Sequence, residues 1–525
     1  MSRFADLKDA LVRAAARRKG GDLSLAAAWT LIGAYAAVFG AICTLKYFSF
    51  AYDDFDLAVH AQVLWNLAFH GSGVSSILGL NFLGNHAHLV SFLLVPLYRI
   101  LPNPLILLWL QTLALAAAAL PLYLIARDVL GRVWSAALVL LYVLYPGLAF
   151  TNLYEFHPTV FATLFLSLML WMYHRRRFIP FLVFLLLAMS CQENIALAAV
   201  GIGLTALIGR RPWRWSLVPL VLGVSYFLFC VRVLMPAFNK DLINFLLLYR
   251  GLGQTPEEIR QALFLDPAKV AKIVLTVPKA YYLTQLFLPV ACLPLLSPAA
   301  LLALLPFLFQ HLVSTRPSDT QIYFHYTAEM IPFIFYAAIL GLGRLLSRWN
   351  RSIVRWPFIA FILAVAAAFG ILIGPYRTVL GDLGGGLRPT FRDRLKQEML
   401  HQVPPQAGVV ATFEFLPRLT NRRDLYSFHH VYAGFYTLSD KAYVLPEAAS
   451  FALIDFLDKR TFKGFYKEKR YENLRAFLDS GAWGIEDVRD DIVLLKKGIP
   501  DRYRLYDVLS RPPEPQFRLD RKTSD

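Results

Sequence analysis

Three carboxylates lie within four residues, at Asp53, Asp54 and Asp56, shortly after an apolar run that ends at Phe50. Where a membrane span meets water, such carboxylates can deprotonate a hydroxyl acceptor or bind a divalent cation through oxygen ligands. A simpler interpretation is that they only end the span and cap the next helix. Asp56 is the expected N-cap of a helix over 57–70.

This helix is expected to be amphipathic. At 100° per residue its polar residues fall within one arc of roughly 160°. They are Asp56, His60, Gln62, Asn66 and His70. We therefore expect the helix to rest on the bilayer surface with its polar face toward a pocket.

Further ionisable residues occur in short segments between apolar runs, where such groups are candidates for function. They are His86, His88, Glu155, His157, Glu193, His311, Arg316, Asp319 and His325. Short loops cannot carry side chains far, so we expect the group to lie near one membrane interface. Each residue also has a structural interpretation, as a helix cap, a polar turn or the start of a span. His86-Ala87-His88 is only a weak indication of a metal site.

Cations near these acids could neutralise a phosphate leaving group, and arginine is the better bidentate phosphate partner. The candidates in segments expected outside the cytoplasm are Arg250, Arg260, Lys279 and Arg316. Acids, cations and a membrane groove together suit glycosyl transfer from a polyprenyl-phosphate sugar. The pattern permits this chemistry without selecting it.

The elements that must position these residues are membrane helices. Of the 525 residues 57% are hydrophobic, and several apolar windows exceed about 18 residues, which predicts an α-helical polytopic membrane protein. The formal charge of +17 lies largely in short loops, where it orients the chain, so we expect no nucleic-acid partner. The four cysteines lie in apolar runs and indicate neither a disulfide nor a metal site.

We expect about eleven spans, each of roughly 14 to 24 residues. They are 24–48, 104–126, 133–150, 158–174, 178–191, 194–209, 215–235, 281–296, 298–313, 326–346 and 354–374. Loops 127–132, 175–177, 210–214 and 344–355 are basic, which places them and the lead-in 1–23 in the cytoplasm and the C-terminus outside. The apolar run 89–101 is only ~13 residues long, too short to cross. We expect it to be a juxtamembrane or re-entrant helix within a long first outer loop, 49–103.

Two further regions are expected outside the cytoplasm. The segment 236–280 should carry two short helices that begin near Thr255 and Asp266, within a membrane region 24–375. From 376 to 525 the composition becomes mixed, and strand-like runs alternate with helical stretches such as 466–478. The expected strands are 409–412, 424–428, 451–454, 483–486 and 492–496. This predicts a small α/β domain, with a terminal hairpin that turns at Asp490 and Asp491.

An ordered set of short motifs resembles a known family. The motifs are Phe55-Asp56-Leu57, Gln62-Val63-Leu64-Trp65-Asn66, Leu83-Gly84-Asn85-His86, Pro96-Leu97-Tyr98, Leu120-Pro121-Leu122-Tyr123, Leu144-Tyr145-Pro146, Glu155-Phe156-His157-Pro158, Gln192-Glu193-Asn194 and His325-Tyr326. The family is the group of bacterial and archaeal membrane proteins catalogued as domain of unknown function 2079. Fold similarity places that group beside the GT-C glycosyltransferases. The chain departs from it at Gln192 and Asn194, where the group tends to have lysine and aspartate.

The resemblance implies a GT-C-like helical bundle with its active site at the outer surface. It also implies that an acid of the first outer loop is the catalytic base or a metal ligand. By position this acid is Asp56, or Asp54 or Asp53.

The leading hypothesis is a GT-C type glycosyltransferase in the cell membrane. It moves a sugar from a polyprenyl-phosphate donor to an unknown extracytoplasmic acceptor. Besides the candidate base, His86, Glu155, His157, Glu193, Arg316 and His325 would bind substrate. Asp54, Asp56 and Glu155 could hold Mg²⁺ or Mn²⁺. The alternatives are a lipid-carrier flippase or transporter, and an envelope assembly subunit without catalysis.

Overall fold

The structure is a computed structural model that describes residues 22–240, 243–348, 351–462 and 470–500. Five helices in these ranges are long and apolar enough to cross a membrane, or up to seven if each of two bent pairs is one span. The five are Leu23–Phe48 (α2), Pro104–Leu130 (α6 and α7), Arg214–Asn239 (α13, η3 and α14), Ile331–Arg348 (α20) and Arg355–Leu372 within α21 (Arg351–Leu372). The chain is therefore a multi-pass membrane protein, as predicted. The number of spans stays a prediction, and the parts of the expected termini at 1–21 and 501–525 lie outside the described residues.

Other predicted spans are shorter or bent in the structure. η1 with α10 (Pro158–His174), α11 (Phe178–Met189) and η2 with α12 (Glu193–Ile208) are apolar but short. α8 (Arg132–Val143) and α9 (Pro146–Leu153) meet at 46°. Pro146 has no backbone N–H and restricts the residue before it, so the helix breaks at this point.

The expected spans 281–296 and 298–313 are irregular rather than single helices. α17 (Val277–Phe287) gives way to the short turns η5 (Leu288–Val290) and η6 (Leu293–Leu296), because Ala291 and Cys292 adopt left-handed backbone conformations. The next apolar run is divided between α18 (Pro298–Leu301) and α19 (Leu305–Val313). The prolines at the starts of these pieces are compatible with a helix only in its first turn.

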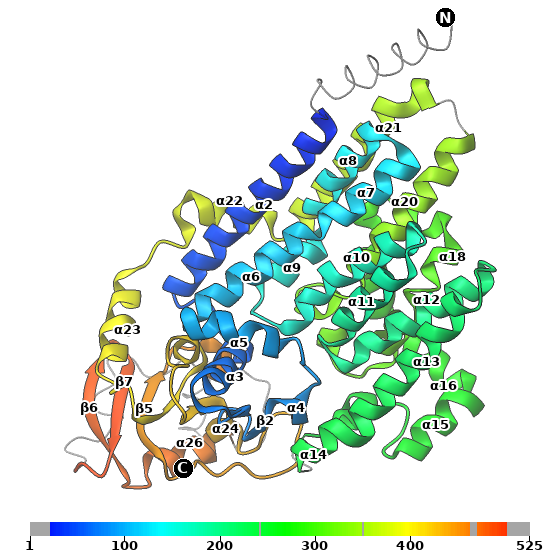
Figure 1. Ribbon diagram of the computed structural model, residues 1–525. Coiled ribbons are helices and arrows are strands. Elements are labelled where there is room, and N and C mark those ends of the chain that lie inside the picture. Colours follow the sequence, from blue (N-terminus) through cyan, green and yellow to red (C-terminus); the bar gives the residue numbers. More distant parts are fainter. Residues whose placement is uncertain (1–21, 241–242, 349–350, 463–469, 501–525) are drawn as a thin grey trace, which may run out of the picture.

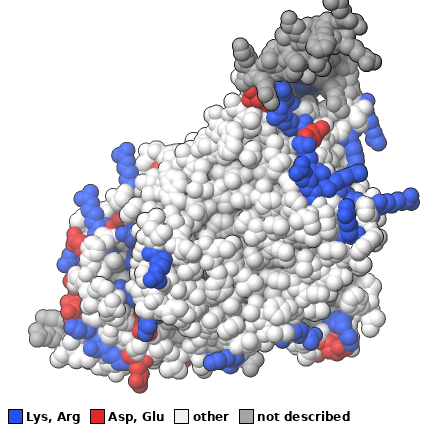
Figure 2. Space-filling view, in the orientation of Figure 1, with Lys and Arg blue, Asp and Glu red and all other residues white. Residues whose placement is uncertain are grey.

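The basic loops lie together at one end of the bundle. Arg127 forms an ion pair with Asp22 at the start of α2 (2.7 Å), and Arg175 forms one with Asp128 (2.9 Å). Arg211 donates to the carbonyl of Tyr173. Figure 2 shows Lys and Arg gathered at this end and a broad, almost uncharged band between it and the charged opposite end. This distribution is typical of a membrane protein whose two ends face different compartments.

The first outer segment lies between the bundle and a C-terminal domain (Figure 1). It contains α3 (Asp56–His70), the strands β1 (Val74–Ser75) and β2 (Leu80–Asn81), α4 (Phe82–Asn85) and α5 (Ser91–Ile100). α3 is buried on both sides, because Leu57 and Leu64 join the core of the bundle while Ala58 and Val59 join the core of the C-terminal domain. The expectation that α3 rests on the bilayer surface is therefore wrong.

α5 does not cross the bundle. Just before the helix, Val90 donates to the carbonyl of Ser190 at the outer end of α11, and just after it the carbonyl of Pro102 accepts from Asn421 of the C-terminal domain. Both ends of α5 therefore lie on the same side, in agreement with the prediction for 89–101.

The second outer segment contains the two predicted short helices. α15 (Pro256–Leu265) begins after Thr255, whose hydroxyl accepts from the backbone N–H of Glu258. α16 (Pro267–Val274) begins after Asp266, which accepts from the backbone N–H of Lys269. Each N-cap side chain satisfies an N–H that has no partner inside the helix.

The C-terminal domain contains a five-stranded mixed sheet in the order β4-β3-β5-β7-β6. Its strands are β3 (Gly408–Ala411), β4 (Leu425–Ser427), β5 (Ala449–Asp455), β6 (Trp483–Arg489) and β7 (Ile492–Lys497). β3 runs parallel to β4 and β5, and β7 pairs antiparallel with β5 and β6. All five strands were predicted, and Asp490 and Asp491 turn the last hairpin with positive φ. The helices α23 (Phe391–His401), α24 (Phe428–Ala433), α25 (Lys459–Phe462) and α26 (Arg470–Leu478) complete it.

The domain packs firmly on the first outer segment. One apolar cluster joins Phe50, Ile77 and Leu78 to Phe415 and Leu453 of the domain. Burial of about 25 cal/mol for each Å² of apolar surface is the main favourable term for such a contact. The polar face of α3 takes part, since the Gln62 amide donates to the carbonyls of residues 422 and 423. Gln62 therefore binds the C-terminal domain rather than facing a pocket.

Candidate functional site

A cavity of about 460 Å³ lies between the outer end of the bundle and the C-terminal domain. The predicted site residues that line it are Asp54, Asp56, His86, His157, Glu193, Arg316 and His325. Asp53 is exposed and Glu155 is buried behind the wall, so neither lines it. The outer loops thus bring most of the predicted set to one place, as their short length led us to expect.

Glu155 fixes the start of α3. Its carboxylate oxygens accept from the backbone N–H groups of Asp54 (2.9 Å) and Leu57 (2.7 Å). The prediction that Asp56 is the N-cap is wrong: Asp56 is the first helical residue, and the residue before it, Phe55, makes no side-chain cap. The capping carboxylate instead comes from a loop about a hundred residues away. Its effect is to set the register in which Asp54 and Asp56 face the cavity.

Asp54 is held by two neighbours. One carboxylate oxygen accepts from the Tyr154 hydroxyl (2.9 Å) and from the guanidinium of Arg460 (2.8 Å). The other oxygen accepts from the backbone N–H of Phe55. Arg460 belongs to the C-terminal domain, so this ion pair joins the domain to the first outer loop inside the cavity.

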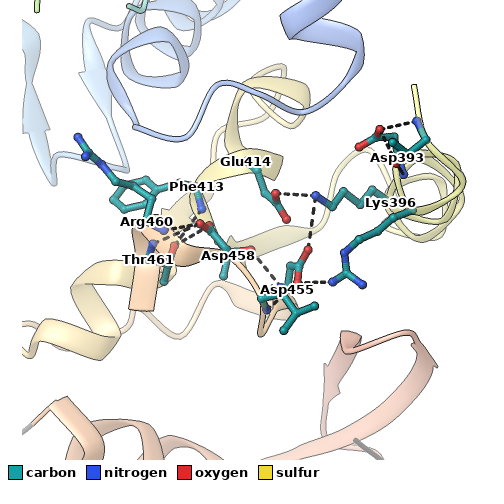
Figure 3. Close-up of polar contacts among 12 residues, drawn as sticks. Asp393, Lys396, Phe413, Glu414, Asp455, Asp458, Arg460 and Thr461 are labelled. Atoms are coloured by element: carbon teal, nitrogen blue, oxygen red, sulfur yellow. Dashed lines mark hydrogen bonds and ion pairs between the residues drawn. The ribbon is translucent and has the colours of Figure 1, made fainter. Parts of the chain in front are cut away.

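A polar network in the C-terminal domain positions Arg460 (Figure 3). Asp458 accepts from the backbone N–H of Arg460 (2.9 Å) and from the Thr461 hydroxyl (2.9 Å). The same hydroxyl accepts from the backbone N–H of Phe413, which also lines the cavity. Phe413 follows β3 and Arg460 follows β5, so the carboxyl ends of parallel strands face the cavity, as is usual for ligand sites in α/β sheets.

Asp56 differs from Asp54 and Glu155, whose carboxylates are both held by hydrogen bonds. No described residue forms a hydrogen bond with its carboxylate in the structure. Burial, with a smaller contribution from the charge of Asp54, raises the pKa of Asp56 to about 8, while Arg316 and Arg460 oppose the shift. A carboxylate with a pKa near neutral pH is suited to proton transfer.

Arg316 supplies a second cation on the bundle side. Its guanidinium donates to Asp319 from Nε (2.8 Å) and lies 4.6 Å from the centre of the Tyr326 ring. Burial opposes the charged form of Arg316, but the ion pair with Asp319 contributes to a pKa that is raised overall. With five donors in a planar fork, an arginine can keep a carboxylate partner and still bind a phosphate.

The histidines pack against one another beneath the acids. The rings of His157 and His325 stack at 3.9 Å, and His60 lies about 5 Å from both His88 and His157. Burial lowers the pKa of His60 to about 3 and lowers those of His88, His157 and His325 well below 6.5. The lowered pKa values favour the neutral form of these four rings, which can then both donate and accept hydrogen bonds but cannot act as cations.

Glu193 lies in the turn where the chain departs from the family pattern. Its carboxylate contacts Nδ1 of His86 (2.8 Å) and accepts from the backbone N–H of Ala87. Gln192 accepts from the Thr159 hydroxyl, and Asn194 extends toward Glu329 on the far side of the turn. Gln192 thus takes part in a hydrogen-bonded wall of the cavity, whereas the contacts of Asn194 are long.

The predicted metal ligands do not converge on one point. Asp54 is bound by Arg460 and Tyr154, and both oxygens of Glu155 accept backbone N–H groups. In the described ranges no group of three or more His, Cys, Asp or Glu side chains could hold a metal ion. Asp54, Asp56 and Glu155 therefore do not fit a shared cation in this arrangement. The requirement for Mg²⁺ or Mn²⁺ stays a prediction.

Three of the cations that the sequence suggested do not line the cavity. Arg250 and Arg260 are exposed and do not line the cavity, and Lys279 donates to backbone carbonyls. Sequence reasoning missed Arg460, because no local pattern marks a contact between positions 406 residues apart. It also missed Glu329, which lies in the predicted span 326–346 but precedes α20 in the structure.

One of three comparisons with known proteins identifies a family of membrane proteins. A family model described as "Predicted membrane protein (DUF2079)" matches residues 46–494. No curated protein matches the chain. Two crystal structures of ArnT from Cupriavidus metallidurans are similar to it: the apo state at 13% identity and the state bound to undecaprenyl phosphate at 14%. Both have a TM-score of 0.48 and cover 88% of this chain and 98% of that chain.

Proposed function

The chain belongs to the DUF2079 family of predicted membrane proteins, and from that premise we propose that it is a membrane glycosyltransferase. It transfers a sugar from a polyprenyl-phosphate donor to an acceptor outside the cytoplasm. The observation that carries the proposal is the pairing of groups in one cavity: an acid without a hydrogen-bond partner among the described residues, Asp56, faces the same space as two guanidinium groups, Arg316 and Arg460. Both arginines act on the charge of Asp56.

Each group has a role in the proposed transfer. The Asp56 carboxylate takes the proton of the acceptor hydroxyl as the acceptor oxygen bonds to the anomeric carbon. The bond from that carbon to the phosphate oxygen breaks, and the electron pair stays on the phosphate. Arg316 and Arg460 neutralise the charge that develops there. Asp54, which already pairs with Arg460, positions that arginine.

The cavity also has a place for a lipid tail. Phe227, Val231 and Met235 line it from the long helix Arg214–Asn239. Phe227 is exposed and Val231 is half-buried, so this apolar wall continues onto the exposed surface of a helix that is long and apolar enough to cross a membrane. A polyprenyl chain can therefore lie along the helix while its phosphate reaches the arginines.

The test compares two neighbouring aspartates. The full chain is purified in lipid nanodiscs and incubated with radiolabelled polyprenyl-phosphate sugars and extracted envelope acceptors, with and without Mg²⁺ or Mn²⁺. We expect Asp56→Asn to lower the transfer rate by about 10²-fold or more, the usual contribution of a general base. Asp53→Asn is the matched control and should retain wild-type transfer, because Asp53 is exposed and does not line the cavity.

Two results would contradict the proposal. Full transfer in Asp56→Asn would remove this residue from the chemistry. No transfer by the wild type from any donor would favour a lipid-carrier transporter or an envelope assembly subunit.

A further inference from the structure

A group of amide, histidine and acidic side chains forms a second polar wall of the cavity. Asn194, Gln310, His311 and Glu329 line it and come from elements of the bundle, η2, α19 and the segment before α20. The proton transfer and the phosphate contacts described above use none of them. Their function must therefore be sought in what else the cavity holds.

These side chains contact one another only loosely. Glu329 Oε1 lies 3.4 Å from the Asn194 amide nitrogen and 3.5 Å from Nε2 of His311. The Asn194 and Gln310 amides are 3.5 Å apart. Good N–H···O hydrogen bonds measure about 2.9 Å, so the group is not closed on itself.

Two acceptors in this wall have no partner. Glu329 Oε2 and Asn194 Oδ1 are buried and without a hydrogen bond among the described residues. The two residues are only 2% and 8% exposed. Buried polar atoms in native proteins are nearly always satisfied, so two orphaned acceptors on residues that line a cavity point to a ligand that donates hydrogen bonds once these side chains turn toward it.

The surrounding chemistry identifies the class of ligand. Carboxylate and amide oxygens accept hydrogen bonds, while the amide nitrogens of Asn194 and Gln310 donate them. A hydroxyl group both donates and accepts hydrogen bonds, so it can pair with this mixture of groups. The charge of Glu329 would instead repel a phosphate. We propose that Glu329, Asn194 and Gln310 bind neighbouring hydroxyl groups of the lipid-linked sugar and so decide which sugar is transferred. This rests on the proposed function and deepens it.

The test uses Glu329→Gln, which keeps the size of the side chain and removes its charge. Donor KM is measured for the polyprenyl-phosphate sugar that the wild type transfers, together with inhibition by bare polyprenyl phosphate. Losing a hydrogen bond to a charged acceptor should raise the donor KM about 10-fold or more. Inhibition by the bare carrier should stay within about twofold, because the phosphate contacts are elsewhere.

Deoxy donors make the test specific. A donor that lacks the hydroxyl bound by Glu329 should bind the wild type weakly and lose nothing further in Glu329→Gln. Glu257→Gln is the matched control, because Glu257 lies on exposed α15. If Glu329→Gln does not fold, as judged by its elution and thermal unfolding, Gln310→Ala replaces it with the same expected direction.

The outcomes separate the two proposals. An active wild type whose donor KM is unchanged in Glu329→Gln would overturn the sugar subsite and leave the transferase intact. The sugar subsite would also be overturned if inhibition by bare polyprenyl phosphate weakened as much as donor binding does. Glu329 would then act on the phosphate or on folding. A wild type without transfer from any donor would overturn both.

Discussion

At the scale of single residues, Asp56 and Asp54 differ in availability although they are two positions apart. Asp54 accepts hydrogen bonds from Tyr154, Arg460 and its neighbouring backbone. Asp56 has no such bonds among the described residues, and its pKa is raised to about 8. These differences in hydrogen bonding are why we propose Asp56, rather than Asp54 or Asp53, as the base.

This raised pKa predicts how turnover depends on pH. A base must be deprotonated, so kcat/KM should rise about tenfold per pH unit below about pH 8 and level off above it. The measurement is a pH profile of sugar transfer at low donor concentration. A profile that is flat between pH 6 and about 9 would contradict Asp56 as the base.

The raised pKa of Asp56 also makes the stability of the folded protein depend on pH. A carboxyl whose pKa is raised on folding stabilises the folded protein below its unfolded pKa, near 3.8, and loses that contribution as the pH rises through about 8. Removing the carboxyl in Asp56→Asn should therefore flatten the fall in melting temperature over this range.

At the scale of elements, Glu155 decides where α3 begins. Its two carboxylate oxygens accept two backbone N–H groups that would otherwise lack partners at the helix start. Glu155→Gln leaves a single side-chain acceptor and should lower the free energy of unfolding by about 1–3 kcal/mol. It should also reduce transfer, since Asp54 and Asp56 flank the site that Glu155 holds.

Denaturant unfolding in detergent, with Asp53→Asn as the control, measures this effect. A Glu155→Gln protein as stable as the control would mean that the carboxylate does not hold the start of α3.

The elements show where sequence reasoning succeeds. Local patterns predicted the five strands, the caps at Thr255 and Asp266 and the noncrossing run 89–101, because each depends on residues close in sequence. The convergence of outer-loop residues followed from short loops. The cap of α3 was assigned wrongly, because Glu155 reaches it from another loop and no helical period records that contact.

At the scale of the whole molecule, the C-terminal domain completes the cavity. It contributes Phe413, Thr437, Leu438 and Arg460 to the lining, and its docking buries one face of α3. A sequence pattern predicts such a domain but not its docking face, because the face depends on apolar side chains that meet only after both parts fold. Arg460 and the contacts of Gln62 therefore became visible only in the structure.

The orientation of the molecule in the membrane stays a prediction from its charge distribution, and it can be tested directly. Lys and Arg gather at one end of the bundle (Figure 2), and by the positive-inside rule we expect that end to lie in the cytoplasm and the cavity to lie outside. Arg177→Cys marks the basic end and Glu257→Cys the outer segment, and both sites are exposed. Three of the four native cysteines are buried, so the wild type should give little background labelling.

A membrane-impermeant maleimide applied to intact cells should label Glu257→Cys and leave Arg177→Cys unlabelled until the membrane is opened. The reverse pattern would put the cavity in the cytoplasm. A transferase with that topology would act on cytoplasmic acceptors, so this labelling decides on which side of the membrane an acceptor must be sought.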